Sequence, residues 1–263
     1  MGEAKRRRRA HTKVLEAHPH CIYCAGQSPA ETAEHMPPLA MFRGRRRPNQ
    51  LVFPTCKACN NGTGHTDLVA SMLGRTYPDG ETEAEREEVH DLVQGVANNV
   101  PGLIEEMAID PATQRARLSG IQNVPAGAGA LRANGPILSR HMITFGAKLG
   151  FALHFELHKT HVPQEGGVQS MYFTNVNKAR GELPTDLIGM LPGPPKTLQQ
   201  GRVNVLDQFA YLFGSTGGGR YSLFYTVFND AFSVAVVTAL DRHEFLIEHA
   251  DKWPVTAPGD FKR

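Results

Sequence analysis

The chain has 263 residues, 41% of them hydrophobic and 21% charged, so it can bury a core and is not a disordered tail. No run of about 18 apolar residues occurs, which argues against a membrane-spanning helix. The basic N-terminus lacks the apolar stretch of a secretory signal. We therefore expect a cytoplasmic protein with no membrane partner, and the sequence leaves its oligomeric state open.

The net charge of +2 hides an uneven distribution. Residues 1–70 carry eleven Lys and Arg against five acids, whereas the rest of the chain is net acidic. One basic run spans residues 6–9, and a second consists of Arg43, Arg45, Arg46 and Arg47. This asymmetry is typical of a surface that binds a polyanion, with a solubilising tail as the alternative for the first run. We expect the second run to bind nucleic acid, with DNA as the partner.

The N-terminal quarter predicts a helix over residues 3–17, which Pro19 ends. An extended segment at 32–36 and a strand at 51–53 follow, and then a helix at 66–73. Gly62 and Gly64 are poor helix formers, so this last helix should begin late or be irregular.

The remainder changes character along the chain. Residues 81–98 and 101–109 predict helices, and the prolines and small residues of 110–136 predict a linker. The strongest helical period runs from Pro136 to about Lys159. Four strands and a final helix complete the pattern, at residues 168–173, 205–213, 221–228, 231–239 and 241–249. The last two strands form a hairpin through Asn229-Asp230. We predict an α+β protein with an N-terminal module (1–75), a helical connector and linker (76–135) and a C-terminal α+β domain with antiparallel strands (136–263).

All four cysteines lie within one 39-residue window and form two Cys-x-x-Cys pairs, namely Cys21 with Cys24 and Cys56 with Cys59. A two-residue spacing lets one tight turn direct both sulfurs at the same ion, and two such turns supply the four ligands that zinc prefers. In an intracellular protein this pattern indicates a structural zinc site and not disulfides.

Between the two pairs lies Glu34-His35-Met36-Pro37-Pro38, and Asn60 directly follows the last cysteine. With these elements residues 15–75 resemble the HNH endonucleases of the ββα-metal fold, in the branch stapled by zinc. The resemblance implies an N-terminal ββα-metal module that hydrolyses phosphodiester bonds in DNA with a divalent ion.

The resemblance also implies roles for individual residues. His35 takes the position of the general base, for which a neutral imidazole is suited at cellular pH. Glu34 and Asn60 take the positions of the ligands of the catalytic ion, and their oxygen atoms suit Mg²⁺ or Mn²⁺, with Zn²⁺ as a further possibility. Asn49 takes the position of the middle Asn, which orients His35. Should the helix after Asn60 be irregular, His65 and Asp67 are alternative ligands.

One further interpretation of the zinc module stays open, and one possible metal site elsewhere is rejected. A non-catalytic zinc ribbon that binds nucleic acid or a protein would use the same cysteines and arginines but would not need Glu34, His35 and Asn60. His154, His158 and His161 recur at helical spacing, and we interpret them as an exposed polar face and not as a metal site.

Overall fold

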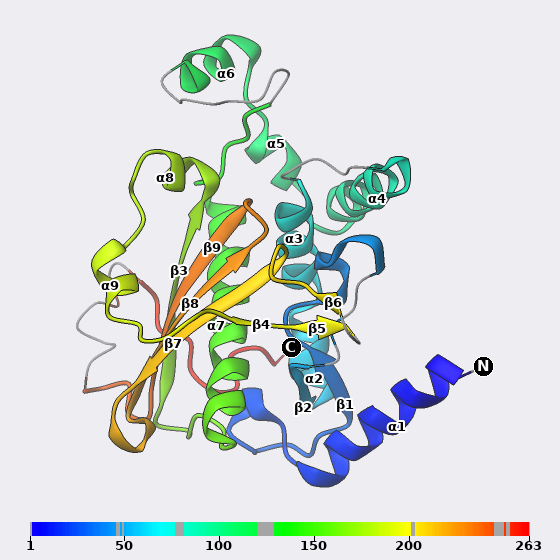
Figure 1. Ribbon diagram of the computed structural model, residues 1–263, viewed down its shortest axis with the longest axis vertical. Helices are drawn as coiled ribbons and strands as arrows, with labels where there is room; N and C mark the ends of the chain where they lie inside the picture. The colour runs from blue at the N-terminus through cyan, green and yellow to red at the C-terminus, as the bar shows by residue number, and fades with distance from the viewer. Residues whose placement is uncertain are drawn as a thin grey trace.

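The computed structural model describes residues 2–45, 48, 50–76, 82–119, 129–200, 203–244, 250 and 253–262. It is a mixed α+β structure with antiparallel sheets, as the sequence predicts. The larger sheet has five strands. Figure 1 shows a long helix behind this sheet and a small hairpin module beside them.

The hairpin module contains two short strands and the helices that follow them. Strand β1 (Thr32–His35) pairs antiparallel with β2 (Val52–Thr55), with Glu34 opposite Phe53 and His35 opposite Val52. Helix α2 (Lys57–Gly62) stops at Thr63, and α3 (Gly64–Arg75) begins directly after it. The predicted irregularity is therefore a break between two helices. The N-terminal helix α1 (Gly2–Ala17) packs against both strands.

The larger sheet has the strand order β3-β9-β8-β7-β4, with all pairs antiparallel. Its strands are β3 (Gly167–Thr174), β4 (Lys196–Thr197), β7 (Phe209–Ser215), β8 (Tyr221–Phe228) and β9 (Phe232–Ala239). Helix α7 (Pro136–His158) packs along one face of this sheet (Figure 1). The predicted long helix and the predicted hairpin of the last two strands are both confirmed.

Close contact between α7 and the sheet depends on two glycines. A side chain at Gly146 would overlap Ser170 of β3, and one at Gly150 would overlap Val236 of β9 and Val168 of β3. The backbone of α7 therefore lies directly on the strands, and neighbouring apolar side chains of α7 fill the space on either side.

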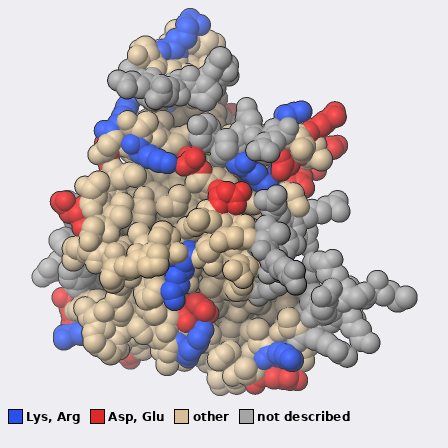
Figure 2. Space-filling view, viewed as in Figure 1, with Lys and Arg blue, Asp and Glu red and all other residues tan. Residues whose placement is uncertain are grey.

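The other face of the sheet carries a smaller apolar cluster around Leu191, Tyr225 and Ala235. Helix α9 (Thr185–Gly189) contributes Leu187 and Ile188 to it. Figure 2, viewed as Figure 1, shows few charged side chains over this part of the molecule, with most of the charges near its upper and lower ends.

The remaining elements connect these parts. They are α4 (Glu83–Asn99), α5 (Leu103–Met107), α6 (Pro111–Leu118), α8 (Asn175–Ala179), β5 (Gln199–Gln200) and β6 (Val203–Asn204). The linker prediction is wrong for residues 111–118, because the Asp110 carboxylate accepts hydrogen bonds from the first turn of α6 and Pro111 occupies its first position. The strand predicted at 205–213 begins only at Phe209. Much of the predicted final helix, residues 245–249, lies outside the described residues.

The hairpin module and the larger sheet share one core. The largest cluster of buried side chains runs from the cysteines through α3 and α7 to Phe261 near the C-terminus. Tyr23 illustrates this continuity, because its ring packs edge-on against both Phe151 of α7 and Phe261.

Candidate functional site

The four cysteines form a cluster that could hold one metal ion. All four are buried, and their sulfur atoms lie within 4.8 Å of one another. Cys21 precedes a short 3-10 turn (Ile22–Cys24) and Cys24 ends it, and the left-handed residues Ala25 and Gly26 follow. Cys56 is the residue before α2, and Cys59 lies in its first turn. Four buried thiols at this spacing fit a tetrahedral zinc ion. The predicted grouping of the cysteines is confirmed.

The electrostatics of the cluster also favour a cation. A hydrogen bond from the thiol of Cys59 lowers the pKa of Cys21 to about 5. The pKa of Cys59 is raised, first by its hydrogen bond with Cys21 and then by burial. Burial raises the pKa of Cys24 as well. Without a positive ion, Cys21 ionises readily and the raised pKa values keep Cys24 and Cys59 protonated. Ionisation of these thiols together therefore requires a metal.

Glu34 lies in a buried ion cluster that sequence analysis did not predict. The ammonium of Lys148 on α7 donates to Glu34 Oε1 and to Asp67 Oδ2 on α3, at 2.5 Å in each case. Lys148 is completely buried, 7% of the Glu34 side chain is exposed and 20% of that of Asp67. Each carboxylate uses only one oxygen: Glu34 Oε2 and Asp67 Oδ1 are buried and accept no hydrogen bond from the described residues.

The carboxylates and the ammonium affect one another's ionisation. Burial raises the pKa of Glu34 to about 7, against the lowering effect of Lys148, and the nearby Asp67 raises it further. The pKa of Asp67 is also raised by burial. Burial lowers the pKa of Lys148, but the two carboxylates outweigh this effect and keep it above the ordinary value. A proton on Glu34 therefore balances the charge of the cluster below about pH 7, and an excess of one negative charge is present only when both carboxylates are ionised.

Asn60 lies on the same side of the hairpin as Glu34. Its side-chain amide donates to Thr32 Oγ1 at 3.2 Å, and Thr32 precedes Glu34 by two residues on β1. Residues two apart on a strand share one face, so the amide of Asn60 and the carboxylate of Glu34 belong to the same face of the hairpin. The hydrogen bond occupies the amide nitrogen, and the amide oxygen is the atom that a cation would need.

His35 lies on the opposite face of β1. The strand is extended through Glu34 and His35, so their side chains alternate. The imidazole of His35 is half-buried toward α1, with its ring centroid 5.8 Å from that of His11. Sequence analysis did not predict the second imidazole of His11. The structure therefore brings Glu34 and Asn60 to one face but does not bring His35 to them.

The second basic run is only partly described. Arg43 begins a 3-10 turn (Arg43–Arg45) with Gly44 in the left-handed region, and its backbone amide donates to Gln208 Oε1 at 2.6 Å. Arg46, Arg47 and Asn49 lie outside the described residues, as does the side chain of Arg45.

The sequence contains one indication that Lys148 is part of a buried ion cluster. Lys148 stands between Ala147 and Leu149 in the most apolar part of α7, and a lone charge on a core-facing helix surface requires a buried partner. The partners lie 114 and 81 positions away in the chain, so no local pattern could identify them.

The prediction of an exposed polar face is wrong, because His154 is buried, His158 is half-buried, and His161 is half-buried and lies beyond the end of α7. His154 is buried and its Nδ1 pairs with Thr238 Oγ1 at 3.0 Å. His158 Nε2 pairs with Ser222 Oγ at 2.9 Å. Hydroxyls of β8 and β9 pair with one nitrogen of each ring, so both imidazoles face the sheet, and His154 Nε2 stays buried without a hydrogen bond from the described residues.

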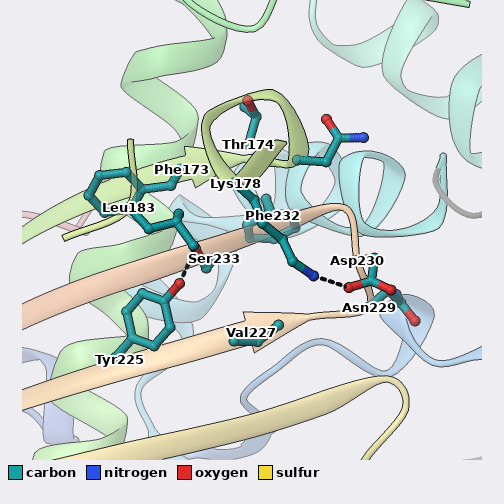
Figure 3. Close-up of a pocket in the computed structure, with 11 residues that line it drawn as sticks. Phe173, Thr174, Lys178, Leu183, Tyr225, Val227, Asn229, Asp230, Phe232 and Ser233 are labelled. Carbon is teal, nitrogen blue, oxygen red and sulfur yellow. Dashed lines mark hydrogen bonds and ion pairs between the residues drawn. The ribbon is translucent and has the colours of Figure 1, made fainter. Parts of the chain in front are cut away.

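A pocket lies away from this site, on the face of the sheet that carries the smaller apolar cluster around Tyr225. Figure 3 shows its apolar lining from Phe173, Tyr225 and Phe232, in which the Tyr225 hydroxyl donates to Ser233 Oγ at 2.9 Å. An ion pair between Lys178 and Asp230 lies at one side of the pocket (Figure 3). None of the residues with a predicted catalytic or metal-binding role lines this pocket.

No protein-family model, curated protein or solved structure matches this chain. Within the part of the chain that the structure describes, no helix is both long and apolar enough to cross a membrane.

Proposed function

We propose that this protein is a zinc-stapled, metal-dependent endonuclease of the HNH type, which hydrolyses phosphodiester bonds in DNA. The observation that supports it best is the hydrogen bond between Asn60 and Thr32. This bond ties the start of the helical segment to the strand of Glu34, so that an amide and a carboxylate share one face beside the cysteine cluster. An oxygen-ligand set of this kind suits Mg²⁺ or Mn²⁺.

In this proposal the four cysteines would hold a zinc ion that fixes the hairpin against α2, and Glu34 and Asn60 would hold a divalent ion that would supply positive charge for the phosphate and the leaving oxygen. His35 accepts the proton of the attacking water. The arginines of the second basic run hold the phosphate backbone. Since His35 and Glu34 occupy opposite faces of β1 and Glu34 is buried, the proposal requires that the substrate phosphate approach His35 across the edge of β1 that pairs with no other strand among the described residues.

The decisive test is plasmid nicking with Mg²⁺ or Mn²⁺, with zinc content and circular dichroism measured on the same samples. We expect His35→Ala to lower the nicking rate about 10²–10⁴-fold while zinc and fold stay unchanged. His243→Ala serves as a control, because this exposed histidine lies far along the chain. Equal nicking by His35→Ala and the parent would exclude His35 as the base.

A second candidate function is a non-catalytic zinc module that binds nucleic acid or a protein. The observation that favours it is the position of His35, which faces α1 and His11 instead of Glu34. Failure of the parent protein to cut plasmid, single-stranded DNA or RNA with any of these metals, together with tight nucleic-acid binding, would favour this candidate.

A further inference from the structure

The Lys148 cluster extends the candidate ion site to a residue on α3. We propose that Asp67 binds the same divalent cation as Glu34, through the carboxylate oxygen that Lys148 does not contact. This inference rests on the proposed divalent site of Glu34 and Asn60. It assigns a ligand from outside the hairpin and outside α2.

The first argument comes from the oxygen atoms. Lys148 contacts Oε1 of Glu34 and Oδ2 of Asp67, and Oε2 and Oδ1 are buried without a hydrogen bond of normal geometry from the described residues, although the buried hydroxyl of Tyr23 lies beside Glu34. Buried carboxylate oxygens nearly always have a partner, because desolvation of an unpaired charged oxygen is costly. Because one ammonium nitrogen binds both groups, the two carboxylates lie close together and each has one oxygen available for the same ion.

The second argument comes from charge and access. When both carboxylates are ionised, they carry two negative charges against the single positive charge of Lys148, so a cation is favoured over a neutral ligand. Two carboxylate oxygens and an amide oxygen are hard ligands, which select Mg²⁺ or Mn²⁺ over metals that prefer sulfur. Glu34 is almost closed to solvent, but one fifth of the Asp67 side chain is exposed. Oδ1 of Asp67 is itself buried, so the exposed part of this side chain marks the nearest approach from solvent to the two oxygens.

The experiment measures Mn²⁺ binding to the full-length, zinc-loaded protein at pH 8, by the loss of the electron paramagnetic resonance signal of free Mn²⁺. Mn²⁺ is a suitable probe because the thiolate site prefers zinc. Asp67→Asn keeps the shape of the side chain and an oxygen for Lys148. We expect it to weaken Mn²⁺ binding at least about tenfold, because it removes a charged ligand. Glu34→Gln should act similarly.

Glu31→Gln is the matched control. Glu31 precedes β1 and pairs with Lys57 at the surface, with 42% of its side chain exposed. Its substitution should leave Mn²⁺ binding unchanged. Zinc content and circular dichroism identify any variant that has lost its fold. If Asp67→Asn does not fold, Asp67→Ser is measured in its place.

The outcomes separate this inference from the proposed function. Mn²⁺ binding by the parent that Asp67→Asn and Asp67→Ser leave unchanged would overturn the role of Asp67, even where the parent nicks DNA. Absence of Mn²⁺ binding to the parent would overturn it as well, and would indicate that the ammonium of Lys148 takes the place of the cation. Binding that depends on Asp67 in a protein that cuts no nucleic acid would support the site and reject the nuclease.

Discussion

Asn229, at the turn between β8 and β9, donates a hydrogen bond from its side-chain amide to the carbonyl oxygen of Gly74 near the end of α3. Both groups are buried, and the two residues are 155 positions apart in the chain. This bond joins the far end of the larger sheet to the helix that follows the cysteine cluster. Together with the shared core, it indicates that the hairpin module and the sheet unfold as one unit.

Zinc removal should consequently destabilise the whole protein. We expect Cys59→Ser to lose the zinc ion and to lower the melting temperature of the α7–sheet signal along with that of the hairpin. Binding of a structural zinc contributes on the order of 10 kcal/mol, which matches the net stability of a typical domain. Elemental analysis and thermal unfolding followed by circular dichroism check this. Lys57→Gln, an exposed substitution on the same helix, should keep the zinc content and the melting temperature of the parent. A variant without zinc that melts like the parent would contradict the prediction.

The second basic run should determine nucleic-acid binding and its dependence on salt. Replacing Arg43, Arg45, Arg46 and Arg47 by Ala should weaken DNA binding and reduce the slope of log K against log salt by up to about 4, because each phosphate contact contributes close to one unit. Fluorescence anisotropy over a series of salt concentrations measures both quantities.

The control for that measurement is a variant in which four surface cations with acidic partners are replaced by Ala, namely Lys57, Lys159, Lys178 and Arg220. The loss of charge is equal in the two variants. An equal change in slope would show that net charge alone governs binding and that the run of arginines has no special role.

His154 should make stability depend on pH. Burial, together with His158 and His161, lowers its pKa to about 4 in the folded protein, compared with 6.5 for an ordinary histidine. His154 stays neutral in the folded protein while it is protonated in the unfolded chain below pH 6.5. The free energy of unfolding is therefore unaffected by His154 above pH 6.5 and falls as the pH drops from 6.5 toward 4. We expect the free energy of unfolding of the parent to drop about 1 kcal/mol more between pH 7.5 and 5.5 than that of His154→Gln.

Urea unfolding at the two pH values gives this difference. Effects of acid on the thiolates are common to both proteins and cancel in the comparison. His243→Gln removes an exposed histidine and should retain the dependence of the parent. An identical pH dependence in His154→Gln and the parent would show that His154 does not contribute.

The contact between α7 and the sheet should make Gly150 intolerant of a side chain. Gly150→Ala should destabilise the protein by about 1–3 kcal/mol, although alanine is the better helix former, because the added methyl overlaps Val236 and Val168. Gly64→Ala, at the start of α3, meets no atom within 4 Å and should be neutral or slightly stabilising. Chemical denaturation measures both, and a stabilised Gly150→Ala would mean that α7 lies further from the strands.

Sequence patterns predicted the elements with strong local signals. The three- and four-residue period of α7 and the Asn229-Asp230 turn are properties of neighbouring residues, and both predictions are confirmed. The small residues around α6 predict a linker, but the hydrogen bonds that Asp110 accepts from the first turn stabilise a helix there. The two-residue strands β4, β5 and β6 have no pattern of their own and depend on pairing with partners elsewhere.

The candidate site divides in the same way. The cysteine cluster could be predicted because two short spacings define it, and the alternation of Glu34 and His35 follows from the period of a strand. The ion cluster could not be predicted, because Lys148 and Glu34 meet only through the packing of α7 on the hairpin. The buried state of His154 likewise depends on Thr238, which lies on the last strand.

The position of Lys148 limits how this module can be divided or transplanted. Residues 1–75 look like a self-contained unit with its own metal, yet the counter-charge for two of its carboxylates is supplied from the second half of the chain. A fragment that ends at Arg75 would expose the apolar surface of α3 and would leave Glu34 and Asp67 without their common donor. Grafting the hairpin onto another scaffold would therefore require an equivalent lysine there.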